Sequence, residues 1–133
     1  MRKELFVHKT IACAALALLP IATTAQAGPS DIFNVTYHVE RAEASKLSLD
    51  RCAEIAQQGA ADTGYVSSAD RHPGKLIVVS GGPAEGGASF LAYCIAVDGK
   101  TASVVQGIDY RRQKSTAGAL ADRVHGSLVE ASK

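Results

Sequence analysis

Residues 89–108, SFLAYCIAVDGKTASVVQGI, contain the clearest hairpin signal in the chain. The dipeptide Asp98-Gly99 favours a tight two-residue turn, because both residue types tolerate a positive φ. The segment before it, Ser89–Val97, is apolar on both faces and predicts a central strand, and Thr101–Ile108 predicts its partner. Alternation along the central strand gives it two faces, one with Phe90, Ala92, Cys94 and Ala96 and one with Leu91, Tyr93, Ile95 and Val97.

The segment Phe33–Glu40 predicts the first strand, because apolar and polar residues alternate along it with a period of two. We expect its apolar side chains to face the core: Phe33, Val35, Tyr37 and Val39. A helix running to about Thr63 follows, since Ser48 is a candidate N-cap and Gly64 a C-terminal stop. The apolar stripe of that helix places Cys52 on its buried face.

Three further segments complete the pattern. Tyr65–Asp70 and Leu76–Val79 predict two strands joined by a turn at His72-Pro73-Gly74. The apolar spacing from Ser115 to about Ala131 predicts a final helix. The order β-α-β-β-β-β-α predicts an α+β domain of two layers, in which an antiparallel sheet of about five strands carries two helices on one face.

Cys52 and Cys94 are the two cysteines that follow the N-terminal segment, and we expect them to form a disulfide. The bond requires Cys94 to point toward the helices, which leaves the other face of its strand more apolar than a solvent-exposed sheet normally is. Either the strand order buries that face or the protein pairs through it. A redox or metal role for the thiols is the alternative, although no C-x-x-C spacing supports it.

Residues 1–27 resemble a secretory signal peptide. They combine a basic start, an apolar run over residues 11–21 and the small-residue site Ala25-Gln26-Ala27. Cleavage after Ala27 leaves residues 28–133 as one small domain, periplasmic or secreted, with no membrane span. The alternative is a lipoprotein acylated at Cys13, for which Thr10 is an atypical residue.

The charge balance excludes some classes of partner. Of the 14 basic and 13 acidic residues, three and one lie in residues 1–27, so 11 and 12 remain. A near-neutral chain lacks the basic excess typical of nonspecific binding to nucleic acids or membrane surfaces. The tyrosines are scattered and tryptophan is absent from the sequence, so no stacking platform for nucleic-acid bases is expected.

The three histidines after the predicted leader, His38, His72 and His125, have no metal-ligand spacing to one another. We interpret them as surface histidines unless folding brings them together, and we expect no metal and no cofactor. The sequence has no G-x-S-x-G or H-E-x-x-H motif. An enzyme is accordingly a lower-ranked hypothesis, in the form of a hydrolase without a recognisable motif.

The densest basic patch lies just before the last predicted helix. Helix N-termini attract anions through their free N–H groups. A carboxylate, a phosphate or an acidic partner loop could therefore bind at Arg111, Arg112, Lys114, Ser115 and Thr116. The alternative is a solvated connection between strand and helix.

Residues 81–87 form a glycine-rich loop in which Glu85 is the one charged residue. A phosphate-binding loop would end in Gly-Lys-Ser/Thr and begin a helix, whereas this loop precedes a strand. We interpret it as a hairpin loop that is either flexible or in contact with a partner. Its candidate contact residues are Gly81, Gly82, Glu85, Gly86 and Gly87.

These features favour a non-enzymatic binding or interaction module of the periplasm, of which an inhibitor or immunity-type protein is one concrete form. The expected partner is a protein or small ligand, and a second copy of the chain could pair through the uncovered sheet face. The alternative is a periplasmic carrier of a small ligand or a metal, which would use the histidines or the basic patch.

Overall fold

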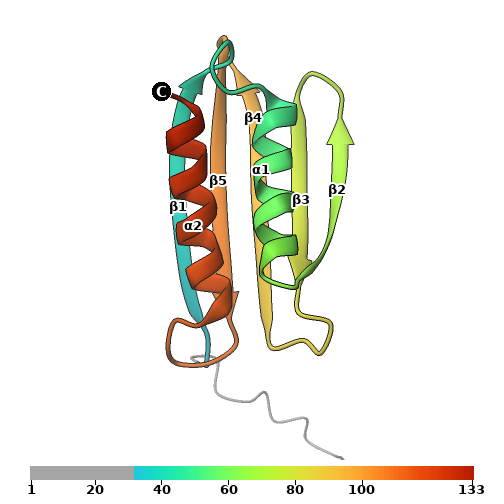
Figure 1. Cartoon of the computed structure of the whole chain (residues 1–133), viewed down its shortest axis with the longest axis vertical. Coiled ribbons are helices and arrows are strands. Elements are labelled where there is room, and N and C mark those ends of the chain that lie inside the picture. The colour runs from blue at the N-terminus through green and yellow to red at the C-terminus, as the bar shows by residue number, and fades with distance from the viewer. Residues whose placement is uncertain (1–31) are drawn as a thin grey trace, which may run out of the picture.

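The computed structural model describes residues 32–133, and its elements follow the predicted order (Figure 1). They are β1 (Asn34–Glu43), α1 (Leu49–Asp62), β2 (Val66–His72), β3 (Leu76–Gly82), β4 (Ala88–Val97), β5 (Lys100–Asp109) and α2 (Thr116–Ala131). The predicted signal peptide and its cleavage site lie outside the described residues.

The five strands form one antiparallel sheet in the order β1-β5-β4-β3-β2, with the β4–β5 hairpin inside it. Asp98 and Gly99 join the two strands with φ values of 49° and 71°, and Val97 pairs directly with Lys100. Two successive left-handed residues give the turn that matches the right-handed twist of the strands. The predicted hairpin is therefore confirmed.

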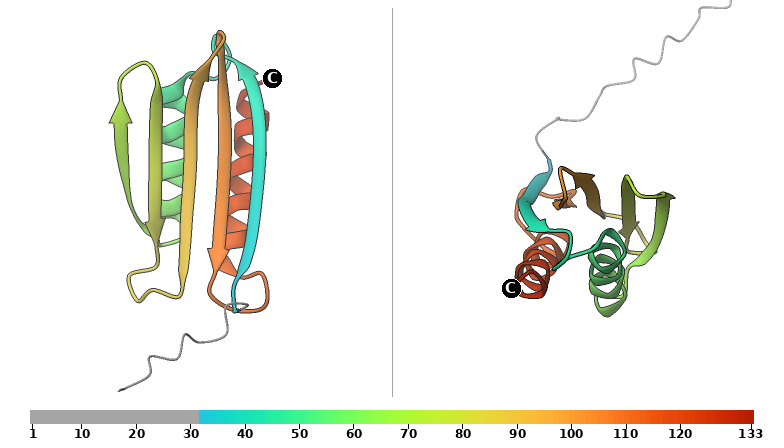
Figure 2. Two further views of the ribbon diagram at one scale, coloured as in Figure 1. Left: turned by 180° about the vertical axis from the view of Figure 1, so that it is seen from behind. Right: turned by 90° about the horizontal axis from the view of Figure 1, so that it is seen from above.

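Both helices lie on the same face of the sheet, with α1 over β2, β3 and β4 and α2 over β1 and β5 (Figure 2). α1 begins where the hydroxyl of Ser48 accepts a hydrogen bond of 3.1 Å from the backbone N–H of Arg51. It ends before Gly64, which takes a φ of 79°. These are the capping signals that the sequence contains, and the two-layer α+β architecture is as predicted.

The core lies between the helices and the sheet, and its largest buried side chains are Phe90, Leu47, Leu120, Leu128, Val79, Val105 and Val124. A disulfide joins Cys52 of α1 to Cys94 of β4, with an S–S distance of 2.03 Å. Structural disulfides persist in oxidising compartments, so the bond indicates an oxidising, extracytoplasmic environment. Within residues 32–133, no helix combines the length and the apolar character that crossing a membrane requires.

The first strand faces the opposite way from the prediction. Phe33, Val35, Tyr37 and Val39 are 52%, 43%, 66% and 59% exposed, so the prediction that they face the core is wrong. Their polar neighbours point toward the helices instead. β1 does alternate with a period of two, but its polar residues face the helices and its apolar residues face the uncovered side of the sheet.

The pairing of β1 with β5 explains this orientation. Thr36 pairs with Gly107 and His38 with Val105, and both partners on β5 are buried beneath α2. The covered face of β1 therefore meets α2, where His38 lies 2.9 Å from a carboxylate oxygen of Asp122. Because α2 presents polar groups to this edge of the sheet, the polar side of β1 is the side that it accommodates.

Replacing both cysteines, C52S together with C94S, is expected to lower the Tm. The bond closes a loop with a sequence separation of 42 residues. A loop of that size is worth about 4 kcal/mol, which corresponds to roughly 20 °C for a small domain. Thermal unfolding followed by circular dichroism measures the shift, and reductant added to the wild-type protein is the matched control. An unchanged Tm in both samples would show that the disulfide contributes nothing to stability.

Candidate functional site

The face of the sheet opposite the helices carries a largely apolar surface, which we call the open-face patch, and the uncharged Gln106 of β5 lies on it between Tyr37 and Leu91. Its members alternate with the buried residues of the same strands, and they come from four adjacent strands. They are Val35, Tyr37 and Val39 of β1, Val104 and Ile108 of β5, Leu91, Tyr93 and Ile95 of β4, and Leu76 and Val78 of β3. No residue within residues 32–133 covers this face with a further layer (Figure 2).

Cross-strand pairing makes the open-face patch contiguous. Val39 pairs with Val104, Val104 with Tyr93, and Tyr93 with Val78. Side chains directly opposite each other on neighbouring strands are in contact range, so this row forms an unbroken apolar band across four strands. The predicted placement of Leu91, Tyr93, Ile95 and Val97 on the face away from the helices is confirmed.

Charged groups on this side of the sheet lie at the margins of the patch. At one end of the sheet, Nζ of Lys100 lies 2.5 Å from Oε1 of Glu43, and Arg41 is exposed one row below. Hydrogen bonding to the Lys100 ammonium holds the pKa of Glu43 below its usual value. At the β2 edge, Nε2 of His72 lies 3.4 Å from Oδ2 of Asp70. An apolar centre with a charged rim is the anatomy of a protein–protein interface.

The helix side of the molecule has a different character. An open groove of about 1050 Å³ runs between α1 and α2, and its lining includes Arg51, Glu54, Gln58, Asp62 and Arg123. Several of these side chains already interact within the chain: Arg51 pairs with Glu54 at 3.3 Å, and Gln58 donates to Asp62 at 2.7 Å. The helix side is therefore the polar surface of the domain, and the sheet side is the apolar one.

The predicted anion site at the start of α2 contains a carboxylate of the chain itself. Asp109 at the end of β5 is 1% exposed and accepts hydrogen bonds from the backbone N–H groups of Ser115 (2.7 Å), Ala117 (3.1 Å) and Gly118 (3.0 Å). These are the free donors that the anion-binding hypothesis relied on. The hydroxyl groups of Thr116 and Tyr65 lie 2.7 Å apart, at hydrogen-bond distance.

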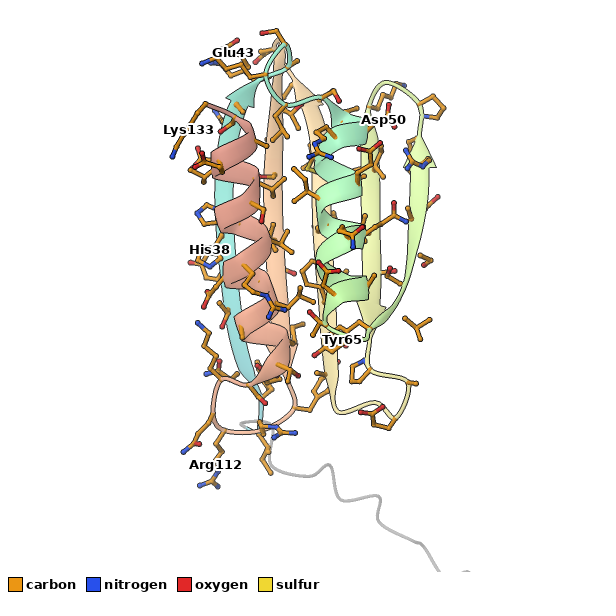
Figure 3. All side chains as sticks on the ribbon, in the orientation of Figure 1. His38, Glu43, Asp50, Tyr65, Arg112 and Lys133 are labelled. Atoms are coloured by element: carbon orange, nitrogen blue, oxygen red, sulfur yellow. A yellow bond between two sulfur atoms is a disulfide. The ribbon has the colours of Figure 1, made fainter. Side chains whose placement is uncertain are left out.

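The basic side chains of this turn take separate positions. Lys114 interacts with the carboxylate of Asp122. Arg111 and Arg112 lie in the exposed turn that joins β5 to α2, and Arg112 projects away from the domain (Figure 3). The structure thus groups Ser115 with Asp109 rather than with the two arginines.

The glycine-rich loop lies at the same end of the sheet as the basic turn (Figure 1). Gly81 and Gly82 are the last residues of β3, and a Cβ atom on Gly81 would stand 2.5 Å from the carbonyl oxygen of Val66. Glu85, Gly86 and Gly87 belong to the exposed β3–β4 connection. Gly87 accepts a hydrogen bond of 3.1 Å from the N–H of Tyr110, which links the two connections.

Folding brings two of the three histidines together. The rings of His38 and His125 stack with centroids 4.3 Å apart, and His38 also contacts Asp122. Hydrogen bonds from Lys114 and then His38 hold the pKa of Asp122 below its usual value. His72 lies elsewhere, next to Asp70 on β2. In the part of the chain that the structure describes, no three His, Cys, Asp or Glu side chains are grouped to hold a metal ion.

The chain belongs to a family of unknown function, DUF6180, whose model matches residues 32–133. No curated protein and no solved structure matches the chain. The family match spans every described strand and helix, so it includes the open-face patch and both loops at the end of the sheet. A function therefore has to be argued from the surface chemistry of the domain.

Replacing Asp109 by alanine is expected to destabilise the domain strongly. The change leaves three backbone N–H groups at the start of α2 without their carboxylate. Losing hydrogen bonds to a buried charged group costs about 3 kcal/mol, or roughly 10–20 °C in Tm. The matched control is Asp62→Ala, an exposed aspartate on α1 whose loss should change Tm by at most about 2 °C. A Tm for Asp109→Ala equal to that of the control would contradict this account of the α2 terminus.

Proposed function

We propose that this protein is a non-enzymatic interaction module of the periplasm and that the open-face patch is its contact surface. The observation that carries the proposal is the unbroken row Val39, Val104, Tyr93 and Val78 on a sheet face that no other element within residues 32–133 covers. Soluble domains rarely expose a contiguous apolar surface of this kind unless it binds something. An inhibitor or immunity-type protein is one concrete form of such a module.

The exposure of the β1 side chains supports a binding role rather than a packing role. Tyr37 and Val39 are more than half exposed although both are large and apolar. Burying them against a partner would remove apolar surface from water, at roughly 25 cal/mol per Å². Tyrosine is also among the residue types enriched at the centres of protein interfaces.

Two independent features support the proposed periplasmic location, one from the structure and one from the sequence. The Cys52–Cys94 bond indicates an oxidising compartment. The signal-peptide pattern of residues 1–27 adds the prediction of export. Together they favour the periplasm as the place where the open-face patch meets its partner.

The proposal is tested by affinity capture from periplasm with tagged wild-type protein and the variant Val39→Asp as baits. The aspartate places an unpaired charge in the apolar band and should abolish capture of the partner, because burying that charge would be costly. Its matched control is Ala61→Asp on the exposed side of α1, which should capture the partner as well as wild type does.

Two results would contradict the proposal. One is equal recovery of the same partner by wild type and by Val39→Asp, since the contact would then lie elsewhere. The other is the absence of any captured chain, including untagged copies of this protein co-expressed with the bait. Circular dichroism of each bait measures whether its fold is intact. We expect Val39→Asp to fold, because Val39 lies on an edge strand and is 59% exposed.

A further inference from the structure

We infer that the partner of the open-face patch is a second copy of this chain, packed face to face around a two-fold axis. The inference rests on the proposed function, because it takes the open-face patch as the contact surface and names its occupant. Size, composition and rim charge each point to this occupant.

The area of the sheet face matches what a stable dimer needs. Three of the five strands have ten residues and the other two have seven. With strands about 4.8 Å apart and a rise of about 3.3 Å per residue, the face measures about 700 Å². A standard protein–protein interface buries about 600–1,000 Å² on each partner. The area of one whole sheet face lies within this range.

The composition of the open-face patch resembles the contact surface of a permanent dimer. Its residues are apolar on four adjacent strands, and the charged groups stand outside it. Interfaces of transient partners are about as polar as the rest of the surface, whereas homodimer interfaces are more apolar and resemble a core cut in half. Two copies of this face would form such a core between two stacked sheets, about 10 Å apart.

When the strands of the two sheets are aligned, a two-fold axis in the plane of the interface allows two arrangements. β4 is the middle strand in the order β1-β5-β4-β3-β2. If the axis follows β4, then β1 of one copy lies over β2 of the other and the strands keep their direction. If the axis crosses the strands, β1 lies over β1 and the two ends of the sheet are exchanged.

The rim charges select the axis along β4. Arg41 occupies the same cross-strand row as His72, and Asp70 is one row away. The axis along β4 thus places Arg41 over His72 of the second copy, one row or about 7 Å along the strand from Asp70, which the long arginine side chain can reach, and two-fold symmetry makes this contact twice. With the other axis, Arg41 would lie over the apolar end of β1 near Val35. Charge complementarity of this kind fixes the register of an interface.

Arg41 is available for this contact. It is exposed, and among the ion pairs formed within residues 32–133 none includes its guanidinium. Asp70 has one ion-pair contact, with His72 at 3.4 Å, and its side chain is 77% exposed. A carboxylate can accept from both groups, because each of its oxygens has two acceptor positions.

The test is sedimentation equilibrium of the exported protein across a micromolar dilution series, with charge reversals at the two rim positions. Wild type should be a dimer. Arg41→Asp and Asp70→Arg alone should each weaken the dimer by about tenfold or more, because each creates two like-charge contacts. The combined swap R41D/D70R should restore the wild-type dissociation constant to within about threefold, since the pair is rebuilt with its signs exchanged. Arg123→Asp, on the helix side, is the matched control and should leave the dimer unchanged.

Each contrary result separates the two proposals. A wild-type monomer that still captures another protein, with capture lost in Val39→Asp, overturns the second-copy inference and leaves the proposed function standing. A wild-type monomer that captures nothing overturns both. A dimer that is insensitive to Asp70→Arg and to Val39→Asp places the contact elsewhere, for example edge to edge through β1, and overturns the inference.

Discussion

The carboxylate of Asp109 determines how α2 sits on the sheet. It accepts hydrogen bonds from three backbone N–H groups, those of the N-cap Ser115 and of Ala117 and Gly118 in the first turn, at distances of 2.7 to 3.1 Å. The helix approaches so closely that a Cβ atom on Gly107 would stand 2.0 Å from the carbonyl oxygen of Ala117. Only glycine fits at that position of β5. This contact places α2 over β1 and β5, on the same face that the Cys52–Cys94 bond assigns to α1.

The exposed apolar surface follows from these two attachments. Because both helices are fixed to one face, the other face of the sheet has no covering layer within the described residues. Antiparallel sheets commonly present a polar face to water, but here β4 is apolar on both sides and β1 adds Tyr37 and Val39 to the uncovered face. The domain consequently has a polar helix side and an apolar sheet side, and this asymmetry favours association through the sheet.

Local sequence signals predicted the element order, the Asp98-Gly99 hairpin, the Ser48 cap and the disulfide, because each depends on a few neighbouring residues or on the cysteine count. The orientation of β1 could not be read in this way. Its alternation is clear, yet which face is covered depends on α2, whose contacts come from more than 80 residues further along the chain. Packing against α2 therefore determines which face of β1 is covered.

The same distinction applies to the candidate sites. His38 and His125 come together only in the folded chain, and their spacing in the sequence does not predict the contact. Asp109 did leave a signal, because an aspartate directly before a basic turn and a helix N-terminus is a natural partner for free N–H groups. The sequence predicted only part of the open-face patch. Its β4 residues were expected on the face away from the helices, whereas its β1 residues were expected in the core.

The central claim is that the open-face patch is a contact surface, and methyl NMR with a soluble gadolinium chelate tests it most directly. Val39, Val104, Leu91 and Ile95 supply probes across the patch, and Ile55 and Ala61 of α1 supply probes on the helix side. The account predicts that the patch methyls are protected from the chelate in concentrated protein and lose that protection on dilution, while the helix-side methyls do not change. Full relaxation enhancement of the patch methyls at every concentration, with and without periplasmic extract, would contradict it.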